Sequence, residues 1–488
     1  MTNRRVISGI RQIGREEWRY WLRSKTATAL GVATLLLIAT SLTTNYVRIN
    51  SEREARLQLQ AVAEETFRNQ PARHPHRMIH YGHYVFRTPA PLAIADPGVD
   101  PYTGTVMFLE GHRQNTATFA PRYTQALSGP LATLSPAFTY QLLVHLLLIV
   151  IGFASLARER EARTDQLVYT MSVSPTALWL GKSVALAGLA LVLSLPLAGI
   201  ALLAWLGGES ALMSFVFWLG YALYLLCWVL MITAGSVWQQ SASSALLVLL
   251  ASWLVLAVLL PRIASSTAET SAPLNTNIRN NLEIAQALRA AGDGHNTSDP
   301  AFAKLRAQLL SQYDVERIEE LPLNYRGIVA EAAEEKQTAA MNRFASRRID
   351  QELAQPSAAN RFNILSPYLA LKSFSITIAN TNLQQHHHFL RDAEALRFSF
   401  VQQLNRLHAS ELTYADDAKR SVDDQSEQRT RIDPHHWRVL DDFESQRENG
   451  AERLAAALPN LAILVLWIFT VALAGQRGAM RTAQQNNA

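Results

Sequence analysis

The sequence lacks the residues that would mark a disulfide-stabilised protein or an enzyme. Its 488 residues include one cysteine, Cys227, which excludes a disulfide within the chain. No H-E-x-x-H metal motif occurs. The phosphate-binding motif G-x-x-x-x-G-K-[ST] is matched only in its last three positions, 181–183, because Thr176 stands where its first glycine belongs. We therefore predict that the chain is not an enzyme, has no catalytic residue and does not itself hydrolyse ATP.

Charged residues are also absent from six long apolar stretches. Each stretch has 17–25 residues and contains no Asp, Glu, Lys or Arg. Lipid offers no hydrogen bonds to the backbone, so an apolar run of about 18 residues predicts a membrane-spanning helix. The six stretches are Thr26–Asn45, Pro136–Ala157, Ser183–Leu206, Ala211–Gly235, Ser244–Leu260 and Ala455–Gly475.

Basic residues gather before the first of these stretches. The first 25 residues hold seven Arg and Lys against only Glu16 and Glu17. Basic segments beside a span remain in the cytoplasm, so the N-terminus is predicted to lie inside, and six spans return the C-terminus to the same side. This pattern predicts a multi-pass membrane protein. The net charge of +5 is explained by this topology, and we expect contact with membrane lipid and no nucleic-acid partner.

The predicted fold is membrane α-helical. It has six transmembrane helices, an N-terminal interfacial helix and a mostly helical extracytoplasmic domain built from two insertions. The predicted segments are a cytoplasmic amphipathic helix (1–25), span 1 (26–45), extracytoplasmic insertion 1 (46–135), span 2 (136–157), a cytoplasmic loop (158–182), spans 3–5 (183–260), helical insertion 2 (261–454), span 6 (455–475) and a cytoplasmic tail (476–488).

The N-terminal segment 5–23 is amphipathic. Apolar side chains lie near one helical face and most arginines on the other. Trp18 and Trp21, with Arg19 and Arg23, are suited to headgroup depth, which predicts a helix lying in the membrane plane. A simple membrane anchor is the alternative.

The two predicted insertions differ in their patterns. Insertion 1 is rich in turn residues and contains two short β-type runs, Tyr84–Phe86 and Thr105–Leu109. It is too irregular to hold a core alone, so we expect the insertions to pack together. Insertion 2 predicts helices at Leu282–Ala291, Ala301–Tyr313, Tyr325–Asp350, Leu369–Ile378, His387–His408 and Trp437–Ala456.

Histidines cluster in these two insertions, and His145 and His295 stand apart from the clusters. Imidazoles at such spacing bind copper or zinc, but they also cap turns, stack and pack. Without cysteine ligands or a metal motif, we predict packing roles and no metal site. The clustered residues are His74, His76, His80, His83, His112, His386, His387, His388, His408, His435 and His436.

The loop after the second span carries the most informative motif. Arg158, Glu159, Arg160 and Glu161 follow the apolar run directly, and a short amphipathic segment then leads to Ser174-Pro175. A charged helix joined to two spans is suited to docking a partner protein. An ordinary connecting loop has the same composition.

This loop resembles the E-R-E-x-G-T-L…P-V-S-P…L-L-G-K signature of permease subunits of ABC-2-type exporters. The signature has a glycine before its threonine, where this sequence has Arg163, and a leucine directly after the threonine, where this sequence has Asp165. Two further pairs of segments resemble a subgroup of these permeases that has large domains between spans 1–2 and 5–6. The pairs are Tyr81–Phe86 with Phe108–Gln114 and Leu365–Pro367 with His386–Arg397. The matching loop residues, with those beside them, form a candidate ATPase-coupling set: Arg158, Glu159, Arg160, Glu161, Thr164, Leu167, Ser174, Pro175, Gly181 and Lys182.

The resemblance implies the membrane subunit of a two-component exporter in the bacterial inner membrane. A cytoplasmic ABC ATPase would bind ATP and Mg²⁺, so this chain would hold no cofactor, and a second permease, identical or paralogous, would complete the complex. The uncharged spans favour an amphiphilic or bulky substrate over an ion. Two alternatives remain: an ATP-driven mechanical or receptor subunit that acts on a periplasmic partner, and an intramembrane enzyme.

Overall fold

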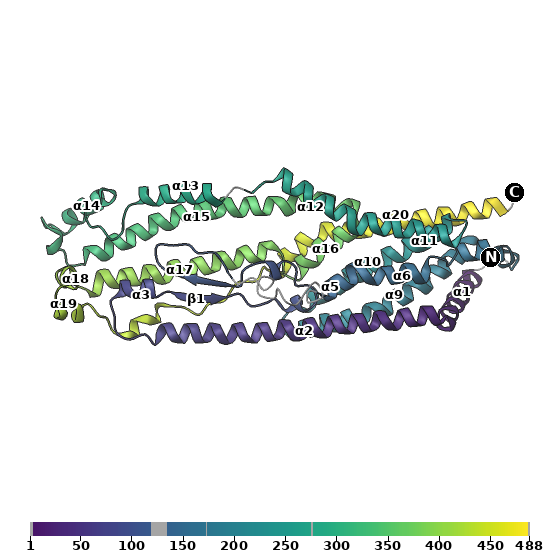
Figure 1. Ribbon diagram of the computed structural model, residues 1–488, viewed down its shortest axis with the longest axis horizontal. Coiled ribbons are helices and arrows are strands. Elements are labelled where there is room, and N and C mark those ends of the chain that lie inside the picture. The colour runs from purple at the N-terminus through teal and green to yellow at the C-terminus, as the bar shows by residue number, and fades with distance from the viewer. Residues whose placement is uncertain (1–2, 119–133, 172, 275–276, 487–488) are drawn as a thin grey trace.

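The protein forms an elongated, mostly helical body in a computed structural model that describes residues 3–118, 134–171, 173–274 and 277–486. Both chain ends lie at one end of the long axis, and α14, α18 and α19 lie at the other (Figure 1). We call the half with the chain ends the bundle and the opposite half the outer domain.

Among the residues that the structure describes, six helical segments are long and apolar enough to cross a membrane, and they coincide with the six apolar stretches predicted from the sequence. Two of them contain a π-helical segment, η4 and η5, at which the backbone hydrogen bonds shift by one residue. The six are α2 (Lys25–Arg68), α5–η4–α6–α7 (Pro136–Glu161), α9 (Pro175–Leu206), α10 (Ala211–Trp238), α11–η5–α12 (Ala242–Ser271) and α20 (Gly450–Asn486).

The helix α2 extends far beyond its apolar stretch. It is one uninterrupted helix of 44 residues and therefore about 66 Å long. The chain beyond Asn45 remains helical because no breaker intervenes and because Glu52 accepts ion pairs from both Arg48 and Arg56, each at 2.9 Å. The helix runs along much of the lower edge of the molecule, from the bundle into the outer domain (Figure 1).

The helix α10 lies at the centre of the bundle, where it contacts α6, α9, α11, α16 and α20. The short helix α16 (Pro367–Ile378) was expected in the outer domain, but it packs into this core. Gly220 of α10 permits the contact, because a β-carbon there would lie 2.1 Å from Phe374 of α16. The second insertion therefore reaches into the bundle.

The outer domain is built from helices around a two-stranded sheet. The strands β1 (His83–Phe86) and β2 (Val106–Leu109) pair antiparallel, with Tyr84 opposite Phe108, which confirms both predicted β-type runs. The short helix η1 (Pro91–Ile94) of the first insertion packs into the bundle core. The helices of the outer domain are α3 (Pro75–Tyr81), η2 (Asp100–Tyr102), α13 (Asn277–Ala291), η6 (Pro300–Phe302), α14 (Ala303–Tyr313), η7 (Ile318–Glu320), α15 (Tyr325–Asn360), η8 (Arg361–Leu365), α17 (Leu383–Glu411), α18 (Tyr414–Lys419), α19 (Asp424–Arg429) and η9 (Pro434–Val439).

One hydrophobic core joins the two insertions. Phe67, Ile79 and Val85 from the first insertion share a buried cluster with Phe400 and Leu404 of α17. The rings of Phe67 and Phe400 meet edge to face, with centroids 5.7 Å apart. This arrangement confirms that the irregular first insertion gains its core from the second.

The helix predicted at Trp437–Ala456 is wrong in its first half. The short helix η9 ends at Val439, residues 440–449 have no regular secondary structure, and α20 begins at Gly450. Side chains from other elements accept hydrogen bonds from backbone N–H groups of this segment. Glu64 accepts one from Phe443 at 3.0 Å, and Asp392 accepts one from Gln446 at 2.8 Å. These partners replace the hydrogen bonds that a helix would supply.

Candidate functional site

Four charged side chains meet where α1 (Asn3–Arg23), α7 (Ala157–Glu161) and α9 converge. Lys182 Nζ lies 2.6 Å from Glu17 Oε2 and 2.9 Å from Glu159 Oε1, and Arg158 lies 3.2 Å from Glu17. Lys182 is 5% exposed and Glu17 is 2% exposed. We call these four residues the ion-pair network. Glu159 and Lys182, two members of the candidate ATPase-coupling set, join α7, α9 and α1 through this network.

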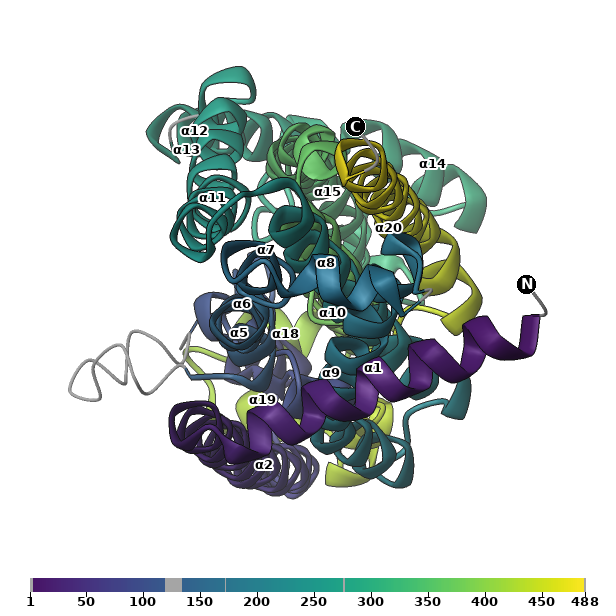
Figure 2. The same ribbon diagram turned by 90° about the vertical axis from the view of Figure 1, so that its right-hand side faces the viewer.

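The helix α1 crosses the end of the bundle (Figure 2). Its close approach to α9 depends on Gly181, because a β-carbon there would lie 2.7 Å from Ile13. Trp21 is buried in the bundle core, and Trp18 packs against that core with its ring centroid 5.8 Å from that of Trp21.

The described arginine side chains of α1 lie on its other side. Arg19 and Arg23 are exposed, and Arg19 pairs with Glu16 at 2.6 Å. The predicted amphipathic helix is therefore present, but the two tryptophans that were expected at headgroup depth face protein. Glu17 was not among the predicted site residues, although it supplies the acidic centre of the ion-pair network.

The outward surface of the predicted coupling loop lies on α8 (Thr164–Thr170) and its ends. Leu167 is 63% exposed and Met171 is 76% exposed, and Glu161 is also exposed. We call Leu167 and Met171 the apolar tip. Leu167 was predicted as a coupling residue, whereas Met171 was missed because a lone methionine carries no sequence signal.

The remaining residues of the candidate ATPase-coupling set stabilise the conformation of this loop. Thr164 donates a hydrogen bond to Glu159, and the Ser174 side chain caps α9, with Pro175 at the first turn. Arg160 donates to the Gln239 carbonyl at 3.0 Å and to Thr482 of α20.

One further hydrogen bond and one unusual backbone conformation shape the same loop. Glu161 accepts a hydrogen bond from the Ala242 N–H at 3.2 Å. Arg163 has a left-handed backbone, with φ at 57°, at the position where the resembling signature has glycine. The loop is therefore tied to α1, α9, α10, α11 and α20.

A buried polar cluster lies where the bundle meets the outer domain. Gln141 donates to the Tyr221 hydroxyl at 2.8 Å, Tyr221 lies 2.8 Å from the Ser375 hydroxyl, and Ser375 donates to Asp96. Asp96 lies outside the six apolar segments, and burial raises the pKa of its carboxyl. The sequence did not identify this cluster because its members come from four separate elements.

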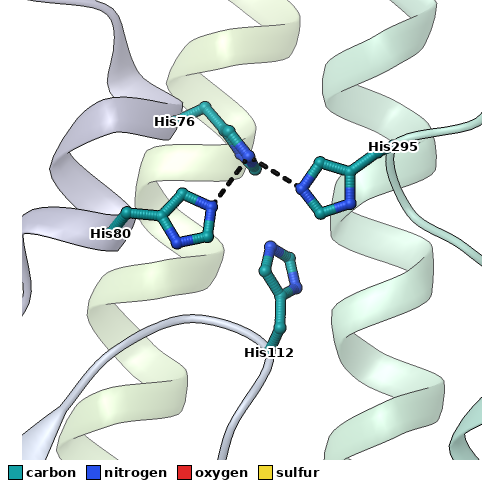
Figure 3. Close-up of side chains that lie close together, drawn as sticks. All are labelled: His76, His80, His112 and His295. Carbon is teal, nitrogen blue, oxygen red and sulfur yellow. Dashed lines mark hydrogen bonds between the residues drawn. The ribbon is translucent and has the colours of Figure 1, made fainter.

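Four histidines converge in the outer domain (Figure 3). His76 Nε2 lies 3.0 Å from His295 Nε2 and 3.2 Å from His80 Nε2, and His112 completes the group. Burial and the neighbouring imidazoles lower the pKa of His76 to about 2. The sequence had set His295 apart from the other histidines, yet the fold brings it to the centre of this group.

Glu334 connects His112 to the interior. Its carboxylate lies 3.2 Å from His112 Nδ1 and 2.5 Å from the Arg397 guanidinium, and both Glu334 and Arg397 are fully buried. The hydrogen bond from His112 and the charge of Arg397 outweigh burial and lower the pKa of Glu334 to about 2. The segments Phe108–Gln114 and His386–Arg397, noted for their resemblance, therefore meet at this point.

A second histidine group is fully buried. His74 and His408 lie 3.1 Å and 2.8 Å from the two oxygens of Asp417, and Asn324 donates to the same carboxylate at 3.1 Å. These hydrogen bonds hold the pKa of Asp417 well below its usual range, despite the opposing effect of burial. This group ties α3, α17 and α18 together, which fits the packing role predicted for these histidines.

The comparisons with known proteins concern the outer domain. A search of curated proteins gives no match. A protein-family model described as a domain of unknown function, DUF3526, matches residues 281–446, about a third of the chain, which includes His295, Glu334 and Arg397.

Proposed function

We propose that the chain is the permease subunit of an ATP-driven transporter of the ABC-2 type. A separate cytoplasmic ATPase would bind ATP and Mg²⁺ and would dock on the apolar tip formed by Leu167 and Met171. A second permease, identical or paralogous, would complete the transport path for an amphiphilic or bulky substrate.

The observation that carries this proposal is the contrast between the base and the tip of the loop. At its base, Glu159 is joined through Lys182 to Glu17, so the loop is tied to α9 and α1. At its tip, Leu167 and Met171 are exposed. Exposed apolar side chains on a rigid base are suited to a protein interface, and a push on the tip would be passed to two helices.

The arrangement of the helices supports a membrane location. Six segments have the length and apolarity to span a bilayer, and many of their large apolar side chains are exposed, including Leu36, Leu195, Leu247 and Phe469. Lipid and the second permease would cover these side chains. With the basic α1 inside, both chain ends would be cytoplasmic and the outer domain periplasmic.

The experiment removes the apolar tip. The chain is purified in detergent with Leu167→Glu and Met171→Glu together, and 8-azido-ATP labelling and ATP hydrolysis measure any associated ATPase. We expect the wild type to retain a labelled ATP-binding protein and the double variant to lose it. Val422→Glu is the matched control, because Val422 is 85% exposed at the far end of the outer domain. Equal ATPase retention by the tip variant and the control would refute docking on the tip.

A mechanical or receptor role is the second candidate. It is favoured by α2, because this single helix contributes Ile38, Leu42 and Ile49 to the bundle core and Phe67 to the core of the outer domain. A rigid helix of this kind would pass movement from the bundle to a partner bound on the periplasmic side. ATP-dependent transport by the purified complex in liposomes would favour the permease role, and ATP hydrolysis without transport would favour the mechanical role.

A further inference from the structure

The four histidines of the outer domain form a group with the dimensions of a metal site. Their nearest nitrogen pairs are 3.0 Å and 3.2 Å apart, and one ligand atom from each residue lies within 4.8 Å of all the others. Zn–N bonds of about 2.0–2.1 Å in a tetrahedron place neighbouring nitrogens about 3.3 Å apart. The free group is therefore close to the spacing that a bound ion requires.

Two of the four rings are oriented by carboxylates on their far sides. His112 Nδ1 lies 3.2 Å from Glu334, and His295 Nδ1 lies 3.1 Å from Asp293. A carboxylate that accepts the Nδ1 proton leaves the lone pair on Nε2, which is the tautomer that binds metal, and this arrangement is typical of the second ligand shell of metal sites. His112 Nε2 points toward the other rings (Figure 3), and it is buried without a hydrogen-bond partner among the described residues.

The backbone around the group is built for close approach. Gly111 sits against α3, since a β-carbon there would lie 2.1 Å from Ile79. The next residue, His112, has a left-handed φ of 62°, a conformation that costs a non-glycine residue free energy and marks functional positions. His76 and His80 are one helical turn apart in α3, so both project from the same face.

Hydrogen bonding alone does not account for this group. A neutral imidazole has one N–H, and His76 Nε2 faces two other imidazole nitrogens, with no carboxylate bonded to it among the described residues. The buried group at Asp417 is different, because there a carboxylate takes both histidine contacts. His80 and His295 are exposed, which gives an ion a path from solvent.

We infer that His76, His80, His112 and His295 together bind one divalent transition-metal ion, Zn²⁺ or Cu²⁺. Four imidazole nitrogens without thiolate or thioether ligands favour these borderline ions over Mg²⁺, Ca²⁺ or Cu⁺. The bound ion would tie α3 and the turn after β2, from the first insertion, to the loop before η6 in the second. It would act as a cross-link between the two insertions, independently of the proposed transport function.

The test uses the full chain in detergent, purified through a tag without histidine and treated with a chelator. Zinc chloride or copper chloride is added, unbound metal is removed, and the metal content is measured by mass spectrometry. We expect one ion per chain and a rise in the midpoint of thermal unfolding of about 5 °C at saturating metal. For copper, electron paramagnetic resonance would show nitrogen ligands.

Variants assign the ion to these residues. His295→Ala should lower the affinity at least tenfold, and Asp293→Asn should lower it about tenfold by releasing the ring of His295. Both positions are exposed, and an unchanged elution volume and circular dichroism spectrum would establish that the variants are folded. The double variant His435→Ala with His436→Ala is the matched control, since it removes a neighbouring histidine pair elsewhere in the outer domain, in which His435 is exposed and His436 half-buried.

The outcomes separate clearly. One ion of either metal in the wild type and in the control, with weaker binding in both site variants, supports the inference. An equal metal affinity in the wild type and in His295→Ala would overturn it. The absence of both metals from the wild type after incubation at about 100 micromolar would also overturn it, because that concentration should saturate even a weak site.

Discussion

Lys182 Nζ lies 2.6 Å from the Glu17 carboxylate, although the two residues are 165 positions apart in the chain. Both are almost fully buried, and Lys182 also reaches Glu159 at 2.9 Å. A buried ammonium group of this kind is tolerated only when carboxylates surround it. The pair therefore holds α1 against α9 at the base of the loop that we propose as the docking site.

Removing one member of this pair should destabilise the bundle strongly. Glu17→Gln leaves Lys182 with one carboxylate and Arg158 with a weaker contact, so we expect a loss of about 3 kcal/mol in the free energy of unfolding. Lys182→Met should cost a similar amount. The measurement is denaturant unfolding of the protein in detergent.

The double variant Glu17→Gln with Lys182→Met tests the coupling between the two residues. Because it removes both charges together, its loss should be clearly smaller than the sum of the two single losses. Additive losses would mean that the two side chains act independently, which would contradict the role assigned to the pair.

Replacing Arg163 by glycine should increase the stability of the loop that contains it. Its φ of 57° is strained for a residue with a β-carbon, and Arg163→Gly should stabilise the turn between α7 and α8 by about 1 kcal/mol. Cleavage by chymotrypsin near Leu167 and Tyr169 should become about fivefold slower, since the turn opens less often. Arg163→Ala keeps the β-carbon, so equal protection in both variants would exclude backbone strain as the cause.

His83 should make the outer domain sensitive to mild acid. Burial, with a smaller effect of Arg68, lowers the pKa of His83 to about 4, against about 6.5 in the unfolded chain. Between these values the unfolded chain binds more protons than the folded one, so stability is complete above about pH 6.5 and falls as the pH drops toward 4. The loss at pH 5 should be about 2 kcal/mol from this residue.

His83→Phe tests this pH dependence. Phenylalanine keeps an aromatic ring against Phe67, which His83 meets edge to face at 5.9 Å, but it does not titrate. The difference in unfolding free energy between wild type and variant should shift by about 2 kcal/mol toward the variant between pH 7.5 and pH 5. A difference that is constant over this range would show that His83 does not titrate with a lowered pKa.

Local sequence patterns predicted much of the fold. The six uncharged stretches, the amphipathic N-terminal helix and the two short strands all correspond to elements of the structure. Each of these predictions rests on hydrophobic periodicity or charge within one continuous segment. The helix expected at Trp437–Ala456 failed because Glu64 and Asp392, from distant elements, accept hydrogen bonds from the backbone of its first half.

Sequence reasoning named only some of the residues of the candidate sites. The loop residues Glu159 and Lys182 were identified by their motif, but their inward direction and their partner Glu17 were not. Leu167 was identified, and its exposure agrees with a docking role. Motif position specifies which residues matter in a loop, whereas the direction of a side chain depends on what packs beside it.

The amino-acid sequence is sufficient to locate the segments that need an apolar surrounding, because an uncharged apolar run of about 20 residues can span a bilayer as a helix, which satisfies its own backbone hydrogen bonds. Which polar side chains meet depends instead on how the helices pack. His295 reaches His76 across 219 positions, and it does so because α3 packs on α17 while α13 packs on α15. Contacts of this kind arise from the packing of whole helices, and no local pattern encodes them.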